Sequence, residues 1–581
     1  MNSLPIFSQA SLEKIRLLLA GAKGLLLLSL LGLICGILAG GIIILFRLLI
    51  ETSQISFLPD SNPENYEALQ WQTRLLLTTG GGLVLGLLFY FISRQPMRVG
   101  VLHTLERLNY HEGHLPLKNA VMQFVGGAIS IISGHSVGRE GPSVHLGAAS
   151  ASLLGQKLRL PNNSIRTLVA CGSAAAIAAS FNTPLAGVIF AMEVIMMEYT
   201  ITGFTPVILA AVSATTISRI TFDAHPAFNV PALELYSFWE LPFIVLMGIT
   251  IGAVAAAFIN SLKWITRQGQ KVPVWLRMTL AGMAVGVCAL LAPEVMGIGY
   301  DTVDAAFLGE IGITTLLLIF IFKWLATVIS IGMGLPAGLI GPTLFIGAMA
   351  GSLSGACLGL LPIELSHPGL YAMLGMGAMM GATLQAPLAA LLALLELTGN
   401  QNIIFPGMLA IVSASLASKE IFGASSVYLS LMKESGLDYR NDPVAQSLRR
   451  LAVASVMNRE FAIVQTEISR NQAENILAKT PHWLVISREE SNLLMPAADL
   501  ARHLEENQDE QIQVMEIPSK RKQLAAVIQQ STLQQALKIL DESEAEALYV
   551  IRPLGTSADH IFGIVTRQDI EEAYRHRSVY N

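Results

Sequence analysis

Charged residues are scarce in this chain, and their scarcity bears on the solvent around it. Asp, Glu, Lys and Arg make up only 14% of the 581 residues, and the mean hydropathy is +0.55. Soluble domains carry about a quarter charged residues, so most of this chain does not lie in water. The net charge of −5 is small and no stretch is strongly basic, which excludes a nucleic-acid-binding surface.

Cysteine is equally sparse, and no catalytic motif is recognisable. The cysteines stand singly in apolar stretches without metal-ligand spacing, so we expect packing roles rather than a disulfide framework or a metal site. They are Cys35, Cys171, Cys288 and Cys357. The absence of a Walker-type phosphate loop and of a nucleophile–base set argues against an ATP-driven pump and against an enzyme. We therefore expect a protein that is no enzyme and requires neither a cofactor nor a metal.

Long apolar segments are what the sequence has instead. Residues 24–46 contain no charge, are long enough to cross a bilayer as a helix, and lack a cleavage pattern, which predicts a membrane span rather than a signal peptide. Further apolar segments occupy 74–93, 119–133, 166–197, 203–219, 238–261, 278–292, 311–331, 337–361, 370–397 and 404–422. Many are Gly-rich and short, which is typical of a transporter with tilted and broken helices in a lipid bilayer.

The charge that is present gathers at the C-terminus. Of the 79 Asp, Glu, Lys and Arg residues, 37 lie in 438–581, which predicts a water-soluble tail of alternating strands and helices. We expect three parts: an interfacial helix in 1–24, a membrane domain in 25–436 and a soluble region in 437–581. The tail and the loop with Arg94 and Arg98 favour the cytoplasmic side of an inner or plasma membrane.

Two parts of the apolar region repeat one pattern. The first has Thr-Pro-Leu-Ala at 183–186 followed by Glu193, and the second has Ala-Pro-Leu-Ala at 386–389 followed by Glu396. The proline and the glutamate are nine residues apart in both. Matching helix breaks in two halves predict inverted repeats with a binding site near the membrane midplane.

Each half also contains a Gly-Pro motif that predicts a helix beginning inside the membrane. These are Gly-Arg-Glu-Gly-Pro at 138–142 and Gly-Leu-Ile-Gly-Pro at 338–342. A helix start presents unpaired N–H groups and the positive end of the dipole, while Gly permits close backbone approach and Pro suits the first turn. The motifs predict an anion site made mainly of backbone amides, including those of Gly141, Leu339 and Ile340.

The first motif, embedded in residues 133–147, resembles a signature of the CLC family of chloride channels and chloride–proton antiporters. The second is similar to that family's Gly-x-Phe-x-Pro, with Ile340 at the Phe position. The resemblance covers about 25–436. It implies an all-α polytopic membrane protein with inverted repeats and broken helices, and a homodimer in which each subunit has its own pore for chloride. Short loops and the compact tail favour a bacterial member.

Glu140 is the first functional candidate. By resemblance it is the gating glutamate, which occupies an anion site when charged and swings away when protonated. A carboxylate inside a membrane is costly and is by itself a functional hypothesis, whereas an acid that only satisfies helix-terminal amides is the alternative. Tyr428 matches the family's tyrosine that donates its hydroxyl to the central anion; an interfacial anchor is the alternative. Arg139 is expected to be a structural counter-charge.

One departure from the family's pattern concerns anion coordination. The family's Gly-Ser-Gly-Ile-Pro aligns by spacing with residues 98–102, so Val99 stands where an anion-coordinating serine usually lies. Valine has no hydroxyl to donate. The amides of Leu339 and Ile340 and the hydroxyl of Tyr428 should therefore carry more of the coordination, and selectivity for chloride over other anions is open.

A second departure concerns protons. Val194 stands where proton-coupled relatives carry an internal glutamate and where channel relatives carry valine. A water chain could carry protons to Glu140 instead. Glu193 and Glu198 are nearby acids, for which a buried structural role is the alternative.

The tail resembles two CBS modules, at about 450–508 and 511–576. In that family, the Thr and Asp of Gly-x-x-Thr-x-x-Asp contact a nucleotide, and Thr566 and Asp569 fit this pattern. The first module's counterpart at 495–499 is degenerate. The resemblance implies adenine nucleotide binding, and the alternative is that Thr566 only caps the following helix.

These features leave more than one function open. We favour exchange of chloride for protons, gated by a protonatable Glu140. The alternative is a passive gated chloride channel, which Val194 favours. A distant alternative is a CBS-regulated membrane transporter of another ion, such as magnesium.

Overall fold

The computed structural model describes residues 9–21, 24–92, 98–222, 228, 230, 233–360, 366–437, 443–488, 492–552 and 561–578. These divide into two compact units. The helical unit comprises Leu28–Gln156 and Arg166–Tyr439, and the mixed unit comprises Met1–Leu27, Lys157–Ile165 and Arg440–Asn581. Arg94, which entered the prediction of orientation, lies outside the described residues.

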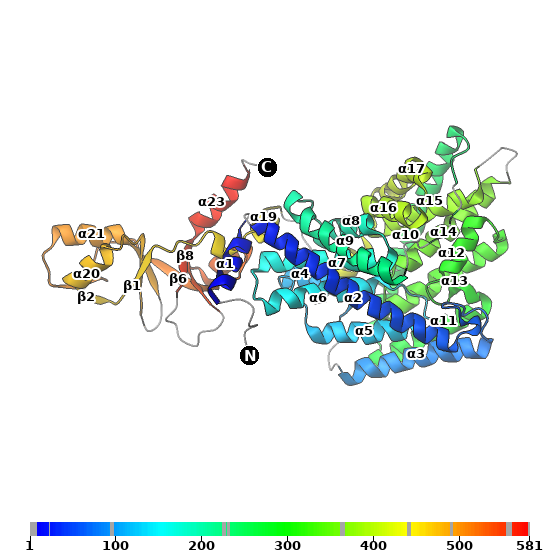
Figure 1. The fold of residues 1–581 in the computed structure, drawn as a ribbon, viewed down its shortest axis with the longest axis horizontal. Coiled ribbons are helices and arrows are strands. Elements are labelled where there is room, and N and C mark those ends of the chain that lie inside the picture. The colour runs from blue at the N-terminus through cyan, green and yellow to red at the C-terminus, as the bar shows by residue number, and fades with distance from the viewer. Residues whose placement is uncertain are drawn as a thin grey trace. The chain divides into compact units, whose positions relative to one another are not determined.

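The helical unit contains apolar helices of very different lengths (Figure 1). They are α2 (Leu25–Phe57), α3 (Trp71–Ile92), α4 (Gly100–Tyr110), α5 (Leu117–Ile132), α6 (Glu140–Lys157), α7 (Asn162–Phe181), α8 (Pro184–Phe190), α9 (Ile201–Phe222), α10 (Leu241–Gly269), α11 (Val274–Leu291), α12 (Tyr300–Leu308), α13 (Ile313–Gly332), α14 (Ile340–Leu358), α15 (Pro368–Leu384), α16 (Pro387–Thr398), α17 (Ile404–Leu416) and α18 (Val427–Glu434). Among the described residues, nine helices are long and apolar enough to cross a membrane.

The apolar segments at 166–197 and 370–397 are each divided by a helix break. Asn182 after α7 has φ 60° and Gln385 after α15 has φ 56°, so both helices end in the left-handed conformation. Pro184 and Pro387 then occupy the first position of α8 and α16. The two breaks follow one geometry, as the repeated Pro–Glu pattern predicts.

Glycine allows the paired helices of each half to touch. A Cβ at Gly375 of α15 would lie 2.4 Å from the carbonyl oxygen of Gly347 on α14. Gly147 of α6 and Gly172 of α7 make the same close approach in the other half. Any larger side chain at these positions would separate the helices.

The mixed unit contains a six-stranded sheet in the order β1-β3-β4-β6-β7-β8. The strands are β1 (Phe461–Val464), β3 (Trp483–Ile486), β4 (Leu493–Pro496), β6 (Lys522–Ile528), β7 (Ala547–Ile551) and β8 (Gly563–Thr566); β2 (Glu467–Ser469) pairs separately with β5 (Gln511–Gln513). The helices are α1 (Gln9–Ala20), α19 (Pro443–Arg449), α20 (Arg470–Leu477), α21 (Ala497–Glu506), α22 (Leu533–Ser543) and α23 (Arg567–Ser578).

The sheet consists of two halves with one topology. β1 is parallel to β3 and β3 antiparallel to β4, while β6 is parallel to β7 and β7 antiparallel to β8. In the first half, α20 precedes β3 and α21 follows β4. In the second half, α22 precedes β7 and α23 follows β8. Each half has its own apolar core, and Val485, Leu494, Ala547 and Ile564 form a cluster that the halves share. The tail is therefore a duplicated α/β unit.

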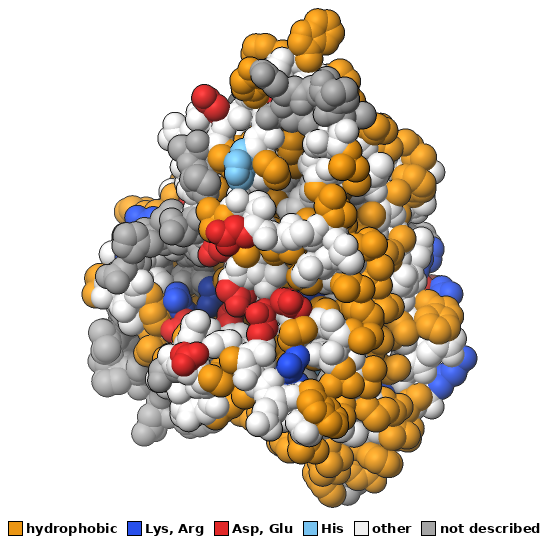
Figure 2. All heavy atoms as spheres, turned by 90° about the vertical axis from the view of Figure 1, so that its right-hand side faces the viewer, with side chains coloured by type: hydrophobic (Ala, Val, Ile, Leu, Met, Phe, Trp, Pro, Cys, Tyr) orange, Lys and Arg blue, Asp and Glu red, His pale blue; other side chains and the backbone are white. Residues whose placement is uncertain are grey.

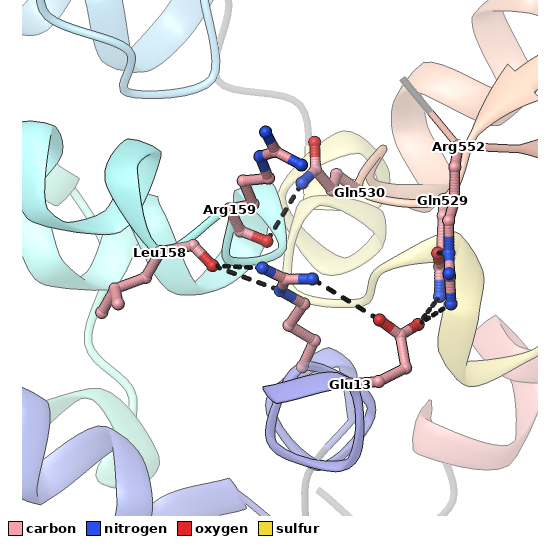
Figure 3. Close-up of polar contacts among 7 residues, drawn as sticks. Glu13, Leu158, Arg159, Gln529, Gln530 and Arg552 are labelled. Carbon is pink, nitrogen blue, oxygen red and sulfur yellow. Dashed lines mark hydrogen bonds and ion pairs between the residues drawn. The ribbon is translucent and has the colours of Figure 1, made fainter. Parts of the chain in front are cut away.

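Polar contacts tie α1 into the mixed unit (Figure 3). Glu13 lies between Arg16 and Arg552, at 3.5 Å and 2.7 Å respectively, and accepts a hydrogen bond from Gln529 at 3.0 Å. Arg16 in turn donates to the carbonyl oxygen of Leu158 at 2.9 Å. The N-terminal helix therefore joins the loop after α6 to residues that directly follow β6 and β7 in the tail.

Candidate functional site

The two Gly-Pro motifs meet in the interior of the helical unit. The N–H of Gly138 donates to the carbonyl oxygen of Gly338, and the N–H of Gly338 donates to that of Gly138, both at 2.8 Å. α6 begins at Glu140 and α14 at Ile340. The bridge therefore holds two helix starts side by side, each with its positive end in the interior.

The Glu140 side chain lies in a cradle of glycines at this junction. It is completely buried. A Cβ at Gly338 or Gly341 would lie 2.6 Å from one of its carboxylate oxygens, and a Cβ at Gly138 would overlap the carboxylate. The carboxylate faces the amides of Glu140 and Gly341, but neither oxygen reaches hydrogen-bond geometry with any described residue. A buried carboxylate with so little compensation favours either protonation or departure from the cradle.

The residues predicted to bind an anion through their amides surround this cradle. A Cβ at Gly141 would lie 2.7 Å from Cα of Gly338, so the two backbones touch. Leu339 is the N-cap residue of α14 and Ile340 its first residue, and both side chains are buried. The amides of Leu339 and Ile340 precede the first intrahelical hydrogen bond, which the N–H of Thr343 makes to Leu339.

Tyr428 lies in the first turn of α18 and is buried. Its hydroxyl has no hydrogen-bond partner among the described residues. The Glu140 carboxylate acts on it electrostatically. The hydroxyl is therefore free to donate to an anion in the same interior region as Glu140.

Val99, at the position where the family's anion-coordinating serine is expected, packs its side chain against other apolar residues. It is the N-cap residue of α4, with φ −142° and ψ 176°. Its side chain packs against the apolar cluster that contains Leu85 and Met122. A hydrophobic side chain at this helix start therefore contributes to packing and leaves the start without a hydroxyl.

Glu193 and Glu396 each bind the helix start of the other half. Glu193 accepts from the amides of Ala389 at 2.8 Å and Leu388 at 3.4 Å, at the start of α16. Glu396 accepts from the amides of Ala186 at 2.8 Å and Leu185 at 3.0 Å, at the start of α8. The two carboxylates are reciprocal helix caps.

Val194 and Glu198 follow Glu193 along the chain. Val194 is buried in the π-helical turn Ala191–Met196 that follows α8. Glu198 is buried after that turn, and its N–H donates to the carbonyl oxygen of Met192.

A cavity of about 280 Å³ adjoins Arg139. Arg47, Glu51, Glu64 and Tyr300 also line it. The Arg139 guanidinium lies 5.6 Å from the ring centroid of Tyr300. It also interacts electrostatically with the carboxylates of Glu51 and Glu64. Arg139 is thus a half-buried cation with carboxylates, aromatic rings and Arg47 around the same cavity.

Acidic side chains gather at the end of the helical unit seen in Figure 2. The Asp301 carboxylate interacts electrostatically with both Glu64 and Glu67. Burial raises the pKa of the Glu64 carboxyl, Arg139 opposes the rise, and Asp301 adds to it. The Glu64 carboxyl is therefore near enough to Arg139, the residue before Glu140, to interact with it electrostatically.

Thr566 and Asp569 hydrogen-bond to each other in the mixed unit. The Thr566 hydroxyl and N–H donate to Asp569 Oδ2 at 2.8 Å and 2.7 Å, and the N–H of Asp569 lies 3.3 Å from the hydroxyl. This reciprocal arrangement is a capping box at the start of α23. Both side chains therefore serve a helix end in this structure.

Sequence reasoning missed polar side chains on α4, α5 and α6. The buried His103 contacts both the buried His145 and the half-buried Asn119, and Gln123 is buried on α5. No spacing rule links these residues, and the available signal was only that histidines occur within a membrane domain.

Comparison with known proteins places the helical unit. A model of the family described as voltage gated chloride channel matches residues 81–419. The chain is 33% identical over 389 residues to a putative chloride channel protein, ClcB-like, of Ralstonia nicotianae, a match that covers 65% of this chain and 90% of that protein. It is 29% identical over 322 residues to the H(+)/Cl(-) exchange transporter ClcA of Vibrio cholerae. This match covers 54% of this chain and 68% of that protein.

Solved structures share the fold. A slow cyanobacterial chloride/proton antiporter matches with TM-score 0.59 and 24% identity over 71% of this chain and 97% of that one. A CLC-type fluoride/proton antiporter matches with TM-score 0.59 and 26% identity, over 71% and 98%. A eukaryotic CLC transporter matches with TM-score 0.59 and 19% identity over 94% of this chain and 98% of that one. The family resemblance of the motif at 138–142 is confirmed. The chain is a multi-pass membrane protein and belongs to the voltage-gated chloride channel (CLC) family.

Proposed function

We propose that this protein exchanges chloride for protons across a membrane, and that Glu140 is the protonatable gate. The observation that carries the proposal is the buried Glu140 carboxylate in a glycine cradle where two helix starts meet. When ionised, the carboxylate takes the place of an anion at these amides. When protonated, it loses its attraction for the helix dipoles, leaves the cradle and lets chloride enter.

The anion is held by backbone amides of Gly141, Leu339 and Ile340 and by the Tyr428 hydroxyl. Because Val99 contributes no hydroxyl, the anion site near the start of α4 discriminates less between anions than a site with serine at this position. One structural neighbour is a fluoride/proton antiporter, so the choice of anion is part of the test.

A passive chloride channel is the second candidate, and Val194 is the observation that favours it. The two mechanisms differ when purified protein is placed in liposomes with an outward chloride gradient. Exchange predicts uphill movement of protons driven by chloride. Chloride efflux without proton movement would establish the channel, and the same assay with fluoride in place of chloride tests the anion.

We propose a homodimer in the inner or plasma membrane with the C-terminal tail in the cytoplasm. The support is the family's general organisation and the many exposed apolar side chains of the helical unit, such as Leu185, Leu388 and Phe405. Mass measurement of the purified protein in detergent tests the dimer, and a single mass of about 62 kDa would contradict it.

We further propose that the duplicated α/β tail is a pair of CBS modules. Its repeated topology and a solved CLC structure that aligns over 94% of the chain support this. Adenine nucleotide binding would involve Thr566 and Asp569, and both capping bonds that Thr566 donates end on Oδ2 of Asp569. Calorimetry on the full chain with ATP tests it, and no heat of binding at millimolar ATP would refute it.

A further inference from the structure

A buried pair of histidines joins two helices of the helical unit. Nδ1 of His103 on α4 lies 2.7 Å from Nε2 of His145 on α6. His103 is 4% exposed and His145 is fully buried. One proton is shared between two ring nitrogens, and each ring can both accept and release a proton. Paired ionisable side chains inside a membrane domain are typical of proton paths.

The partner of His103 on its other side sets the direction of this hydrogen bond. Nδ2 of Asn119 on α5 donates to the carbonyl oxygen of Arg98 at 3.0 Å and lies 3.4 Å from Nε2 of His103. An amide nitrogen only donates, so Nε2 of His103 accepts, and Nδ1 carries the proton toward His145. The neutral His145 ring then carries its own proton on Nδ1, which has no hydrogen-bond partner among the described residues.

A second buried atom completes a polar track. Gln123 lies one helical turn beyond Asn119 on α5, and its Oε1 also has no partner in the described part of the chain. The Gln123 side chain lies near the start of α4, because a Cβ at Gly100 would lie 3.8 Å from its Oε1. Its Nε2 donates to the carbonyl oxygen of Pro336 at 2.7 Å. A buried N–H and a buried carbonyl oxygen are the two ends that a bound water joins.

We propose that His103 and His145 pass protons between the inner side of the membrane and Glu140. This inference rests on the proposed exchange function and supplies the relay that Val194 cannot. Water takes the place of the Asn119 amide at Nε2 of His103 and delivers a proton there, and His103 then gives its Nδ1 proton to Nε2 of His145. His145 releases its Nδ1 proton to water, which protonates the Glu140 carboxylate. One proton enters and one leaves, so both rings stay neutral, and tautomerisation of each ring through water restores the first tautomers before the next proton.

Charged side chains lie near the His103 end of the relay. Arg98, Arg107 and His111 act on His103 electrostatically, and Glu106 pairs with Arg98 at 3.1 Å.

The two ends of the relay differ in access. Asn119 is only partly buried, and the Arg98 side chain is 37% exposed, so the His103 end lies near solvent. Glu140 precedes His145 by five residues, a rise of about 7.5 Å along a helix, and the two side chains leave α6 on different sides. Water beside Gln123 therefore spans the last step.

The test compares His103→Gln, His145→Gln and His103→Glu in liposomes, with chloride efflux and proton movement measured together. Glutamine keeps a hydrogen bond but carries no proton at pH 7, whereas glutamate titrates. We expect both Gln variants to lower proton movement by about tenfold or more while chloride efflux persists, and His103→Glu to retain coupling. His135→Gln is the matched control, because His135 is fully buried and bonded to Ser133 at 2.9 Å.

The outcomes separate the relay from the exchange function. Wild-type exchange with unchanged coupling in both Gln variants would overturn the relay alone. Equal loss in His103→Gln and His103→Glu would also overturn it, because it would show a packing role. Wild-type chloride efflux without protons would overturn the exchange proposal and the relay with it. If His145→Gln does not fold, the comparison of Gln and Glu at His103 decides.

Discussion

Gly138 and Gly338 hydrogen-bond each other reciprocally, with each N–H donating to the other's carbonyl oxygen at 2.8 Å. These residues lie 200 positions apart and just before the first residues of α6 and α14. The bridge sets the distance between two helix starts through the backbone alone. The Glu140 carboxylate fits beside it only because no side chain projects from the surrounding glycines.

The glycine cradle yields the first prediction. In Gly341→Ala, the added Cβ would lie 2.6 Å from Glu140 Oε1, so the carboxylate must move. We expect chloride-driven proton movement in liposomes to fall by about tenfold or more, because misplacement by an ångström has effects of this size. Gly41→Ala on α2 is the control, since a Cβ there meets no atom within 4 Å. Equal coupling in both variants would contradict the cradle.

The second prediction concerns Glu193 and Glu396, which cap the starts of α16 and α8. Glu193→Gln or Glu396→Gln should lower the free energy of unfolding by about 1 kcal/mol, since a neutral amide holds the helix-start N–H groups less strongly than a carboxylate. Thermal unfolding in detergent measures this, with the exposed Glu310→Gln as control. Proton coupling should persist in Glu193→Gln. Lost coupling at unchanged stability would make Glu193 a relay rather than a cap.

The sequence predicts the repeat but not its pairing. The Pro–Glu spacing identifies Glu193 and Glu396 as equivalent, yet only tertiary structure shows that each caps the other half's helix. Likewise, the Gly-Pro motif singles out Glu140 because a membrane carboxylate at a helix start is chemically distinctive. His103 and His145 are 42 residues apart without a spacing signal, so their contact could not be predicted.

The contact network of α1 yields a pH prediction. Partial burial opposes ionisation of Glu13, but the hydrogen bond from Gln529 and the charges of Arg552 and Arg16 outweigh it and hold the pKa of Glu13 below its usual 4.5. A lowered carboxyl pKa stabilises the docked helix above the ordinary pKa, and this contribution is lost as pH falls through the folded value.

Hydrogen exchange of residues 9–20 measures this docking. After correction for intrinsic exchange, protection should fall as pH drops from 6 to below 4, and Glu13→Gln should be less protected at pH 6 and insensitive to pH. Protection of wild type that does not vary with pH would contradict the role of Glu13.

Tyr428→Phe tests the hydroxyl as an anion ligand. The ring is retained, so packing is unchanged and only a donor is lost. We expect chloride to bind about fivefold more weakly by calorimetry, the cost of about one hydrogen bond. Tyr90→Phe on the exposed face of α3 is the control. An unchanged Kd would remove Tyr428 from the site.

The most direct test of the account compares wild type with Glu140→Gln in liposomes under an outward chloride gradient, following external pH and chloride together. Glutamine keeps the shape of the side chain but cannot carry a proton. We predict uphill proton movement in wild type, and its complete loss with continued chloride passage in Glu140→Gln. Proton movement that survives in Glu140→Gln would contradict the assignment of Glu140 as the protonatable gate.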